Sequence, residues 1–553
     1  MPEPRTLIDL YLQGIERHPR VDRFLQKIGG VYQAIPTAEF DQKVRACAGA
    51  LAALGVSRGD RVAIVSYNRV EWAIADFACQ LLGAVDVPIY STLPADQVAY
   101  ILQDSGAKAA FVENAAQLEK VQGRVAHVIS FDKAPGAHSF EEFLKRVKDV
   151  KPAAVEPDDL ATLLYTSGTT GVPKGVMLTH RNLVSNVIAS CALLAPTPAD
   201  TALSFLPLSH SFERLLDYAM FHGGASIAYA EHVDKVVENL QDVRPTIMGA
   251  VPRFYEKVYA KIVKSVQELP AGKRDKFEWA RRTGALMAEF RRRGGKAPFG
   301  LRLRHWIADR LVFRKFAARV GGRIRYFVSG GGPLSRDIAE FFHSLNLMIL
   351  EGYGLTETSP VLTINAPGST RLGTVGRPIP GVELKIAPDG EILARGPNIM
   401  KGYYNKPQET AEVIQDGWFA TGDIGELDPE GYLKITDRKK DLLKTSGGKY
   451  VAPQPIENAL KLSPYVVNAI VIGDRQKFPA ALIVPAPGAT REQIEGALEH
   501  VNQALAHHEQ LKKFVLVEKD FTVESGELTP TMKVRRKVVE KKYKGLIDSI
   551  YAE

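Results

Sequence analysis

Cysteine is scarce in this chain, with only three copies, Cys47, Cys79 and Cys191, among 553 residues. Their odd number, wide separation and lack of a CxxC pair argue against a disulfide framework and against a cysteine metal site. Polar residues and prolines interrupt the uncharged stretch 183–199, so no membrane span is predicted. The N-terminal residues carry acids and prolines where a signal peptide needs an apolar run. We therefore expect a cytoplasmic protein.

Strong net charge is also missing, since 71 Lys and Arg stand against 63 Asp and Glu, a net of +8. So mild an excess does not imply nucleic acid, and we predict no nucleic acid partner. Hydrophobic residues make up 45% of the chain, which is typical of a globular protein and argues against disorder. The length predicts three to five ordinary domains, or fewer large ones.

Short β-rich runs alternate with helical patterns in the first quarter of the chain. Strand-like runs alternate with segments in which apolar residues recur three and four positions apart, as in a helix. This alternation predicts a parallel or mixed sheet covered by helices, an α/β fold. The alternating segments, beginning and ending with a strand, are 61–66, 72–84, 85–90, 94–106 and 107–112.

The composition of the sequence changes near Asp437. A polar, glycine-containing stretch follows, and then a smaller β-rich segment around one amphipathic helix. We predict a boundary here between a large N-terminal domain, residues 1–437, with mixed sheets covered by helices, and a small α+β C-terminal domain, residues 438–553.

The segment 163–180 reads LLYTSGTTGVPKGVMLTH, an apolar strand running into a loop rich in hydroxyls and glycine. Hydroxyls, exposed backbone N–H groups and one ammonium are the donors that a polyphosphate needs. The Walker pattern is absent, because Lys174 lies between Pro173 and Gly175. The candidate phosphate ligands are Thr166, Ser167, Gly168, Thr169, Thr170 and Lys174.

This string resembles the signature phosphate loop of the adenylate-forming enzymes, which include acyl-CoA synthetases, luciferase and nonribosomal adenylation domains. Further segments in the same order carry the resemblance over nearly the whole chain: FVSGGGPLS, EGYGLTETSP, DGWFATGDIG, ITDRKKDLLKTSGGKY and GELTPTMKVRRK. The resemblance implies a C-terminal domain that moves relative to the N-terminal one.

The resemblance assigns nucleotide contacts to six positions. It implies that the backbone at Gly331 and Gly332 lies along the adenine, where only glycine permits so close an approach. Tyr353 would stack on the adenine beside Gly354, and Asp423 would accept hydrogen bonds from both ribose hydroxyls. Arg438 would also contact the ribose.

The resemblance also assigns the reacting groups. Thr356 would contact the α-phosphate, while Glu357 and Thr170 would hold Mg²⁺, which prefers hard oxygen ligands. Lys533 would reach the substrate carboxylate and the α-phosphate, and Lys440 would be the hinge between the domains. Taken by itself, the DRKKD segment reads as a charged linker.

The segment LPLSHSFERLLDYAMFHGGA, residues 206–225, is predicted to form the part of the site that binds the acyl chain. By resemblance His210 lies at the junction of acyl chain and thioester, where we expect it to position the substrate. Residues after it, with Gly223 and Gly224, are apolar enough to line a tunnel for an alkyl chain.

The implied activity is that of a long-chain fatty acid:CoA ligase using ATP, Mg²⁺ and coenzyme A. Two alternatives stay open. One is a fatty acyl-AMP ligase that transfers to an acyl carrier protein, and the other is a nucleotide- or lipid-binding protein without turnover. The lack of an obvious extra insert near the domain boundary weakens the first, and the full set of reactive residues argues against the second.

Positive charge is concentrated in residues 273–325, which hold seventeen Lys and Arg against four Asp and Glu. Aromatic residues are interleaved with this charge. One interpretation is a pair of solvated helices whose aromatics face the core; the other is a peripheral contact with an anionic membrane on its inner face. The aromatics in question are Trp279, Phe290, Phe299, Trp306, Phe313 and Phe316.

Overall fold

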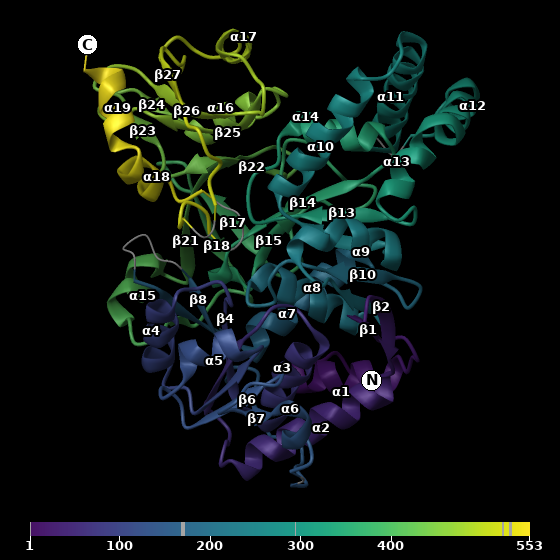
Figure 1. Cartoon of the computed structure of the whole chain (residues 1–553), viewed down its shortest axis with the longest axis vertical. Helices are drawn as coiled ribbons and strands as arrows, with labels where there is room; N and C mark the ends of the chain where they lie inside the picture. The colour runs from purple at the N-terminus through teal and green to yellow at the C-terminus, as the bar shows by residue number, and fades with distance from the viewer. Residues whose placement is uncertain are drawn as a thin grey trace.

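Two large mixed sheets form most of the N-terminal part of the chain (Figure 1). The computed structural model describes residues 2–146, 148–166, 172–292, 295–522, 525–529 and 534–552, and the account below concerns these. The first sheet has a parallel region from β8 to β7 and antiparallel pairings at β9 and β19. Its strand order is β19 (Gly402–Tyr403), β9 (Lys174–Thr179), β8 (Leu160–Thr166), β4 (Val85–Ile89), β3 (Arg61–Val65), β5 (Ala109–Val112), β6 (His127–Ser130) and β7 (His138–Ser139).

The second sheet is parallel in its middle and antiparallel at both edges. The carboxyl ends of its parallel strands lead into the glycine-rich and aromatic motifs of the sequence. Its strand order is β16 (Arg377–Pro378), β15 (Val361–Ile364), β14 (Ile349–Gly354), β13 (Tyr326–Ser329), β12 (Ile247–Ala250), β10 (Thr201–Ser204), β11 (Ser226–Tyr229), β1 (Phe24–Ile28) and β2 (Val31–Ile35).

Buried helices lie between and around these sheets and share one core with them. Trp72, Val187 and Phe221 belong to that core, and they come from α3, α7 and α8. The uncharged stretch 183–199 is therefore mostly a buried helix. The helices of this part are α1 (Leu7–Arg17), α2 (Thr37–Ala53), α3 (Val70–Leu82), α4 (Ala95–Ser105), α5 (Ala115–Val121), α6 (Phe140–Phe143), α7 (His180–Leu194), α8 (Ser211–His222), α9 (Val236–Val243), α10 (Pro252–Gln267) and α14 (Arg336–Ser344), with short 3₁₀ turns at Val233–Lys235 and Thr356–Thr358.

The strands and helices predicted between residues 59 and 112 are confirmed as β3, α3, β4, α4 and β5. A third sheet then follows the second in the chain. It consists of β17 (Glu383–Ile386), β18 (Glu391–Arg395), β21 (Trp418–Leu427), β20 (Ile414–Gln415) and β22 (Leu433–Arg438), with α15 (Pro407–Val413) beside it.

The C-terminal part has hydrophobic cores of its own, both built from residues 443–551. The amphipathic helix predicted within the β-rich segment is confirmed as α17 (Arg491–Asn502), and the described residues around that segment form three further helices: α16 (Pro453–Leu460), α18 (Arg536–Lys542) and α19 (Lys544–Tyr551). These three are only seven or eight residues long, too short for a clear apolar period. The strands are β23 (Leu443–Lys444), β24 (Tyr450–Val451), β25 (Val466–Ile472), β26 (Ala480–Pro485) and β27 (Phe514–Leu516).

Two ion pairs join the C-terminal part to α10. Lys461 Nζ lies 2.9 Å from Glu256 Oε1, and Arg253 Nη2 lies 3.0 Å from Asp520 Oδ2. Arg253 also donates to the backbone oxygen of Val467 at 2.7 Å. Helix α10 therefore contributes polar contacts between the two parts.

A helical arm projects from the second sheet, at the upper right of Figure 1. It consists of α11 (Ala271–Arg292), α12 (Phe299–Ala308), a π-helical turn (Asp309–Phe313) and α13 (Arg314–Arg319). The interpretation in which these aromatics face the core holds for Phe313, which is buried, but not for Phe299 and Trp306, which are exposed. Across the residues described, no helix is both long and apolar enough to cross a membrane.

Candidate active site

The predicted phosphate segment is a β-hairpin in which β8 pairs antiparallel with β9. Thr166 and Lys174 face each other in the register, so they bracket the loop between the two strands. Ser167, Gly168, Thr169 and Thr170 lie outside the described residues, as does Lys533. The donors that can be located here are therefore Thr166 and Lys174.

Lys174 and Glu357 meet through a tyrosine that the sequence analysis did not single out. The Lys174 ammonium lies 5.0 Å from the centroid of the Tyr403 ring, and the Tyr403 hydroxyl donates to Glu357 Oε1 at 2.9 Å. Tyr403 lies on β19, which pairs with β9, so a strand from far along the chain brings it beside the hairpin. Burial and the Glu357 charge raise the pKa of Tyr403, so it stays protonated and remains a donor.

Tyr353, Asp423 and Arg438 form a second polar group. The Tyr353 hydroxyl donates to Asp423 Oδ2 at 2.7 Å, and Arg438 Nε lies 3.4 Å from Asp423 Oδ1. Asp423 and Arg438 are opposite each other in the pairing of β21 with β22. This group presents an aromatic face, a carboxylate and a guanidinium in one place, as a nucleoside site requires.

Lys440 links these two groups electrostatically. Burial and the nearby Arg438 charge lower its pKa, while the charges of Asp441, Asp423 and Glu357 oppose that shift. The predicted hinge residue therefore lies close enough to both carboxylates to respond to their charge. It comes two residues after the end of β22, where the chain leaves the third sheet.

The glycines of two motifs have distinct steric roles. A side chain at Gly330 would press on the Phe212 ring, about 3.0 Å from its nearest atom, and Gly331 has a φ of +79°. Gly332 has ordinary space around it, with Pro252 at 3.7 Å. A Cβ at Gly354 would overlap the backbone of Pro360, so only glycine fits there.

His210 is the N-cap of α8, and its Nδ1 accepts a hydrogen bond from Phe212 N at 3.1 Å. Along α8 beyond it, Leu216 and Met220 line a small cavity against β10, β11 and β12, together with the carboxyls of Glu213 and Asp217. The prediction that Gly223 and Gly224 line a tunnel does not match this cavity, because they pack against Pro196 and His18.

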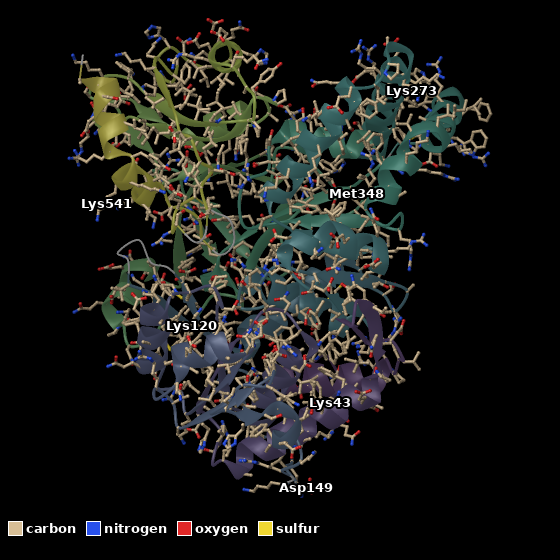
Figure 2. All side chains as sticks on the ribbon, in the orientation of Figure 1. Lys43, Lys120, Asp149, Lys273, Met348 and Lys541 are labelled. Carbon is tan, nitrogen blue, oxygen red and sulfur yellow. The ribbon has the colours of Figure 1, made fainter. Side chains whose placement is uncertain are left out.

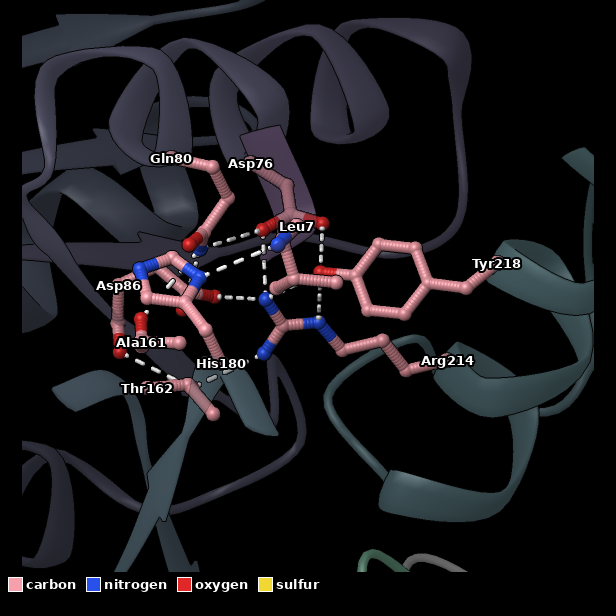
Figure 3. Close-up of polar contacts among 9 residues, drawn as sticks. All are labelled: Leu7, Asp76, Gln80, Asp86, Ala161, Thr162, His180, Arg214 and Tyr218. Atoms are coloured by element: carbon pink, nitrogen blue, oxygen red, sulfur yellow. Dashed lines mark hydrogen bonds and ion pairs between the residues drawn. The ribbon is translucent and has the colours of Figure 1, made fainter. Parts of the chain in front are cut away.

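A buried ionic network fixes α8 in place (Figure 3). Arg214 Nη2 lies 2.5 Å from Asp76 Oδ1 and 2.8 Å from Asp86 Oδ2, and the Tyr218 hydroxyl donates to Asp76 Oδ2 at 2.7 Å. Arg214 also donates to Thr162 Oγ1 on β8 at 2.9 Å. The helix that begins at His210 is thus tied to the strand that ends at Thr166.

The two carboxylates of this network share one guanidinium. Burial raises the pKa of Asp86 to about 7, while the Arg214 charge opposes the shift. Gln80 donates to both carboxylates, at 3.4 and 3.3 Å, which helps to satisfy their remaining oxygens. The network contacts the site only through the elements it anchors, so its role is positioning.

Glu351 is a further buried carboxyl that the sequence analysis missed. It lies on β14, two residues before Tyr353, and burial raises its pKa to about 8. Within the described part of the chain, its Oε1 has no hydrogen-bond partner. The sequence offers no signal for this, because an acid at a strand end usually meets solvent.

The described site combines donors for phosphate, a nucleoside-binding group and the adjacent helix α8, whose cavity-lining residues include both apolar and acidic side chains. Thr356 lies in the short 3₁₀ turn after β14, one residue before Glu357. Such an arrangement suits the binding of a nucleotide next to an apolar carboxylic acid.

Comparison with protein families gives two matches along this chain. The family described as AMP-binding enzyme matches residues 15–404, and the AMP-binding enzyme C-terminal domain matches residues 440–553. The two matches together span nearly the whole chain.

Named relatives are similar over nearly their full length. The long-chain-fatty-acid–CoA ligase FadD15 of Mycobacterium tuberculosis is 39% identical over 95% of this chain and 93% of its own. The peroxisomal long chain acyl-CoA synthetase 7 of Arabidopsis thaliana is 32% identical over 100% of this chain and 87% of its own.

Solved structures share the fold. A Mycobacterium tuberculosis fatty acyl CoA synthetase has a TM-score of 0.66 at 26% identity, covering 98% of this chain and 99% of its own. The anthranilate CoA ligase AuaEII, solved with anthranoyl-AMP, has a TM-score of 0.80 at 21% identity and covers 98% of each chain.

Proposed function

We infer that this chain, which belongs to the AMP-binding enzyme family, is an AMP-forming long-chain-fatty-acid–CoA ligase. Ligases of this kind use ATP and Mg²⁺, and coenzyme A is the co-substrate that accepts the acyl group. A carboxylate is a poor acyl donor because oxide would have to leave, so it is activated before a thiol attacks. The alternative of transfer to a carrier protein is not favoured, since the curated relatives are CoA ligases.

Activation proceeds in two displacements. A carboxylate oxygen of the fatty acid attacks the α-phosphorus, the bond from that phosphorus to the bridging oxygen breaks, and pyrophosphate leaves. The coenzyme A sulfur then attacks the acyl carbon, the acyl–oxygen bond breaks, and AMP leaves with its electron pair. The thiol proton passes to solvent.

We propose that Tyr353, Asp423 and Arg438 hold the nucleoside, with Gly331, Gly332 and Gly354 allowing its close approach. The observation that supports this is the Tyr353–Asp423–Arg438 group, which brings an aromatic ring, a carboxylate of the type that accepts hydrogen bonds from ribose hydroxyls, and a guanidinium to one place. Thr166 and Lys174 would bind the departing phosphates, together with Ser167, Gly168, Thr169 and Thr170 of the same loop.

We propose that Glu357 holds Mg²⁺ with help from Thr170. Its Oε1 accepts from Tyr403, which orients the carboxylate and leaves oxygen lone pairs for a hard cation, so the residue fits the ion. The ion supplies charge neutralisation at the phosphates when bound. Thr356 and Lys533 would stabilise the charge that develops on the α-phosphate, and His210 would position the acyl group.

We propose that residues 1–437 and 438–553 are domains that rotate about Lys440 between the two steps. The separate cores of residues 443–551 support independent movement of that part. The two ion pairs to α10 would break during such a rotation. Conformational steps of this kind limit turnover in many enzymes.

We also propose a cytoplasmic location at the inner face of a membrane, with contact through residues 273–325. The exposed aromatics of that segment support this partner.

Fatty-acid-dependent exchange of labelled pyrophosphate into ATP, without coenzyme A, tests the proposed first step. The ligase predicts exchange only when both Mg²⁺ and a fatty acid are present. A binder without turnover predicts none, and exchange that needs no fatty acid would contradict the assigned substrate.

A further inference from the structure

Two backbone contacts pair the chain before Lys533 with the chain after it. Leu528 forms an isolated antiparallel β-bridge with Val534, which is bonded directly to Lys533. The backbone N–H of Arg535 donates to the backbone oxygen of Glu527 at 2.7 Å. Whatever holds this pairing in place therefore also fixes both ends of the segment that carries Lys533.

Arg536 holds the C-terminal side of this pairing. It begins α18, and its side chain is only 16% exposed. Its Nη2 donates to Glu457 Oε1 at 2.6 Å, and its Nη1 donates to the backbone oxygen of Val471 at 2.6 Å. Glu457 Oε1 also accepts from the backbone N–H of Val471 at 2.8 Å. One guanidinium thus ties the residues just after Lys533 to both α16 and β25.

The N-terminal side of the pairing is held by Glu527 and by apolar packing. The Glu527 side chain is buried, and its Oε1 accepts from Lys542 Nζ on α18 at 2.9 Å. Leu528 and Val539, the latter also on α18, belong to one hydrophobic core with residues of β25. Figure 2 labels Lys541 on this helix, at the edge of the C-terminal part. Helix α18 therefore supports both sides of the pairing.

The helix that receives Arg536 is also tied to the nucleoside group. The backbone N–H of Gln454, in the first turn of α16, donates to Asp437 Oδ2 at 3.3 Å. Asp437 Oδ1 in turn accepts from the backbone N–H of Arg438 at 2.7 Å. Contacts therefore run from the proposed ribose contact, through α16, to the residues beside Lys533.

We propose that Arg536 and Glu457 are positioning residues for adenylate formation, an inference that rests on the role proposed above for Lys533. They hold the chain beside Lys533 against α16, so that its ammonium meets the α-phosphate in one orientation. Both act through Lys533 and not on the substrate itself. Such support matters because a misplacement of about 1 Å can lower a rate by on the order of 100-fold.

Half-reaction kinetics of two variants tests this proposal. Arg536→Gln and Glu457→Gln each break the ion pair but keep a polar side chain. We expect kcat for palmitate-dependent pyrophosphate exchange to fall about tenfold with KM for ATP unchanged, because the interaction lost is made only in the transition state. Thioester formation from preformed palmitoyl-AMP should stay within about twofold of the wild type, since that step does not use Lys533. Arg536→Lys keeps the charge and should recover most of the exchange.

Lys544→Gln is the matched control. Lys544 lies on α19 and forms an ion pair with Asp548 at 2.8 Å, but both side chains are exposed. This variant should match the wild type in both half-reactions, and melting temperatures would show that every variant folds. A merely structural role for Arg536 would lower the two half-reactions together. Equal loss of both, or unchanged pyrophosphate exchange in Arg536→Gln, would overturn the proposal.

Amide hydrogen exchange tests the same positioning without any substrate. We expect faster exchange in Arg536→Gln at the amide of Arg535, which donates to Glu527, and unchanged exchange in the strands of the first sheet. Unchanged exchange at Arg535 would overturn the proposal whatever the activity. Faster exchange at Arg535, in a protein whose wild type shows no pyrophosphate exchange, would support the anchoring by Arg536 and contradict the proposed function instead.

Discussion

The Tyr403 hydroxyl donates a hydrogen bond to Glu357 Oε1 at 2.9 Å, although the two residues are 46 positions apart. The bond fixes one oxygen of the carboxylate that we assign to Mg²⁺. The same ring lies 5.0 Å below the Lys174 ammonium. Tyr403 therefore connects the cation-binding and phosphate-binding groups of the site.

Tyr403→Phe removes this hydrogen bond but keeps the ring under Lys174. We expect the KM for Mg²⁺·ATP to rise about tenfold, because a hydrogen bond to a charged group contributes roughly 1.5–3 kcal/mol. Steady-state kinetics across Mg²⁺ concentrations measures this. Tyr404→Phe is the matched control, since Tyr404 packs in a different hydrophobic cluster, and an equal loss in both variants would contradict the role of Tyr403.

Lys440→Pro fixes φ at the proposed hinge. We expect adenylate formation to be retained and thioester formation to fall, because the domain could no longer rotate freely. Single-turnover assays of each half-reaction measure the two steps separately. Unchanged thioester formation would refute the hinge.

Lys533→Ala should have the opposite pattern. We expect it to abolish adenylate formation while thioester formation from preformed acyl-AMP stays largely intact, because its charge is needed only while pyrophosphate leaves. The same half-reaction assays apply, and equal loss of both steps would count against the assigned role.

Much of this site follows from local sequence, because each motif carries its own geometry. Asp423 and Arg438 face each other simply because β21 and β22 form adjacent antiparallel strands. Tyr403 could not be found in this way, since it reaches Glu357 through the long-range pairing of β19 with β9. The sequence also could not show which aromatics of the arm face the core, because Phe313 is buried and Phe299 is exposed although arginines lie close to both in the sequence.

The buried network around Arg214 gives a stability prediction. Arg214→Met would leave Asp76 and Asp86 without their shared cation, so we expect a loss of about 3–5 kcal/mol in the first urea transition. Arg181→Met is the control, because Arg181 and Asp158 form an exposed, solvent-screened pair whose loss should hardly change stability. Equal stability of both variants would mean that the network does not anchor α8.

The raised pKa of the Glu351 carboxyl should make the stability of the protein depend on pH. Its pKa is raised to about 8 in the folded protein from an ordinary 4.5. Stabilisation from the neutral carboxyl is thus complete below about pH 4.5 and is lost as the pH rises through 8. The glutamine of the Glu351→Gln variant cannot ionise. We therefore expect the urea midpoint of the variant to rise relative to that of the wild type as the pH increases from 5 to 8. Parallel profiles would show that Glu351 is ionised in the folded protein.

We expect this chain to convert a long-chain fatty acid to its coenzyme A thioester through an acyl adenylate. Mass spectrometry of the products from ATP, Mg²⁺ and palmitate, with and without coenzyme A, tests it most directly. We predict palmitoyl-CoA and AMP when coenzyme A is present. Acyl-AMP that accumulates despite coenzyme A would contradict the account.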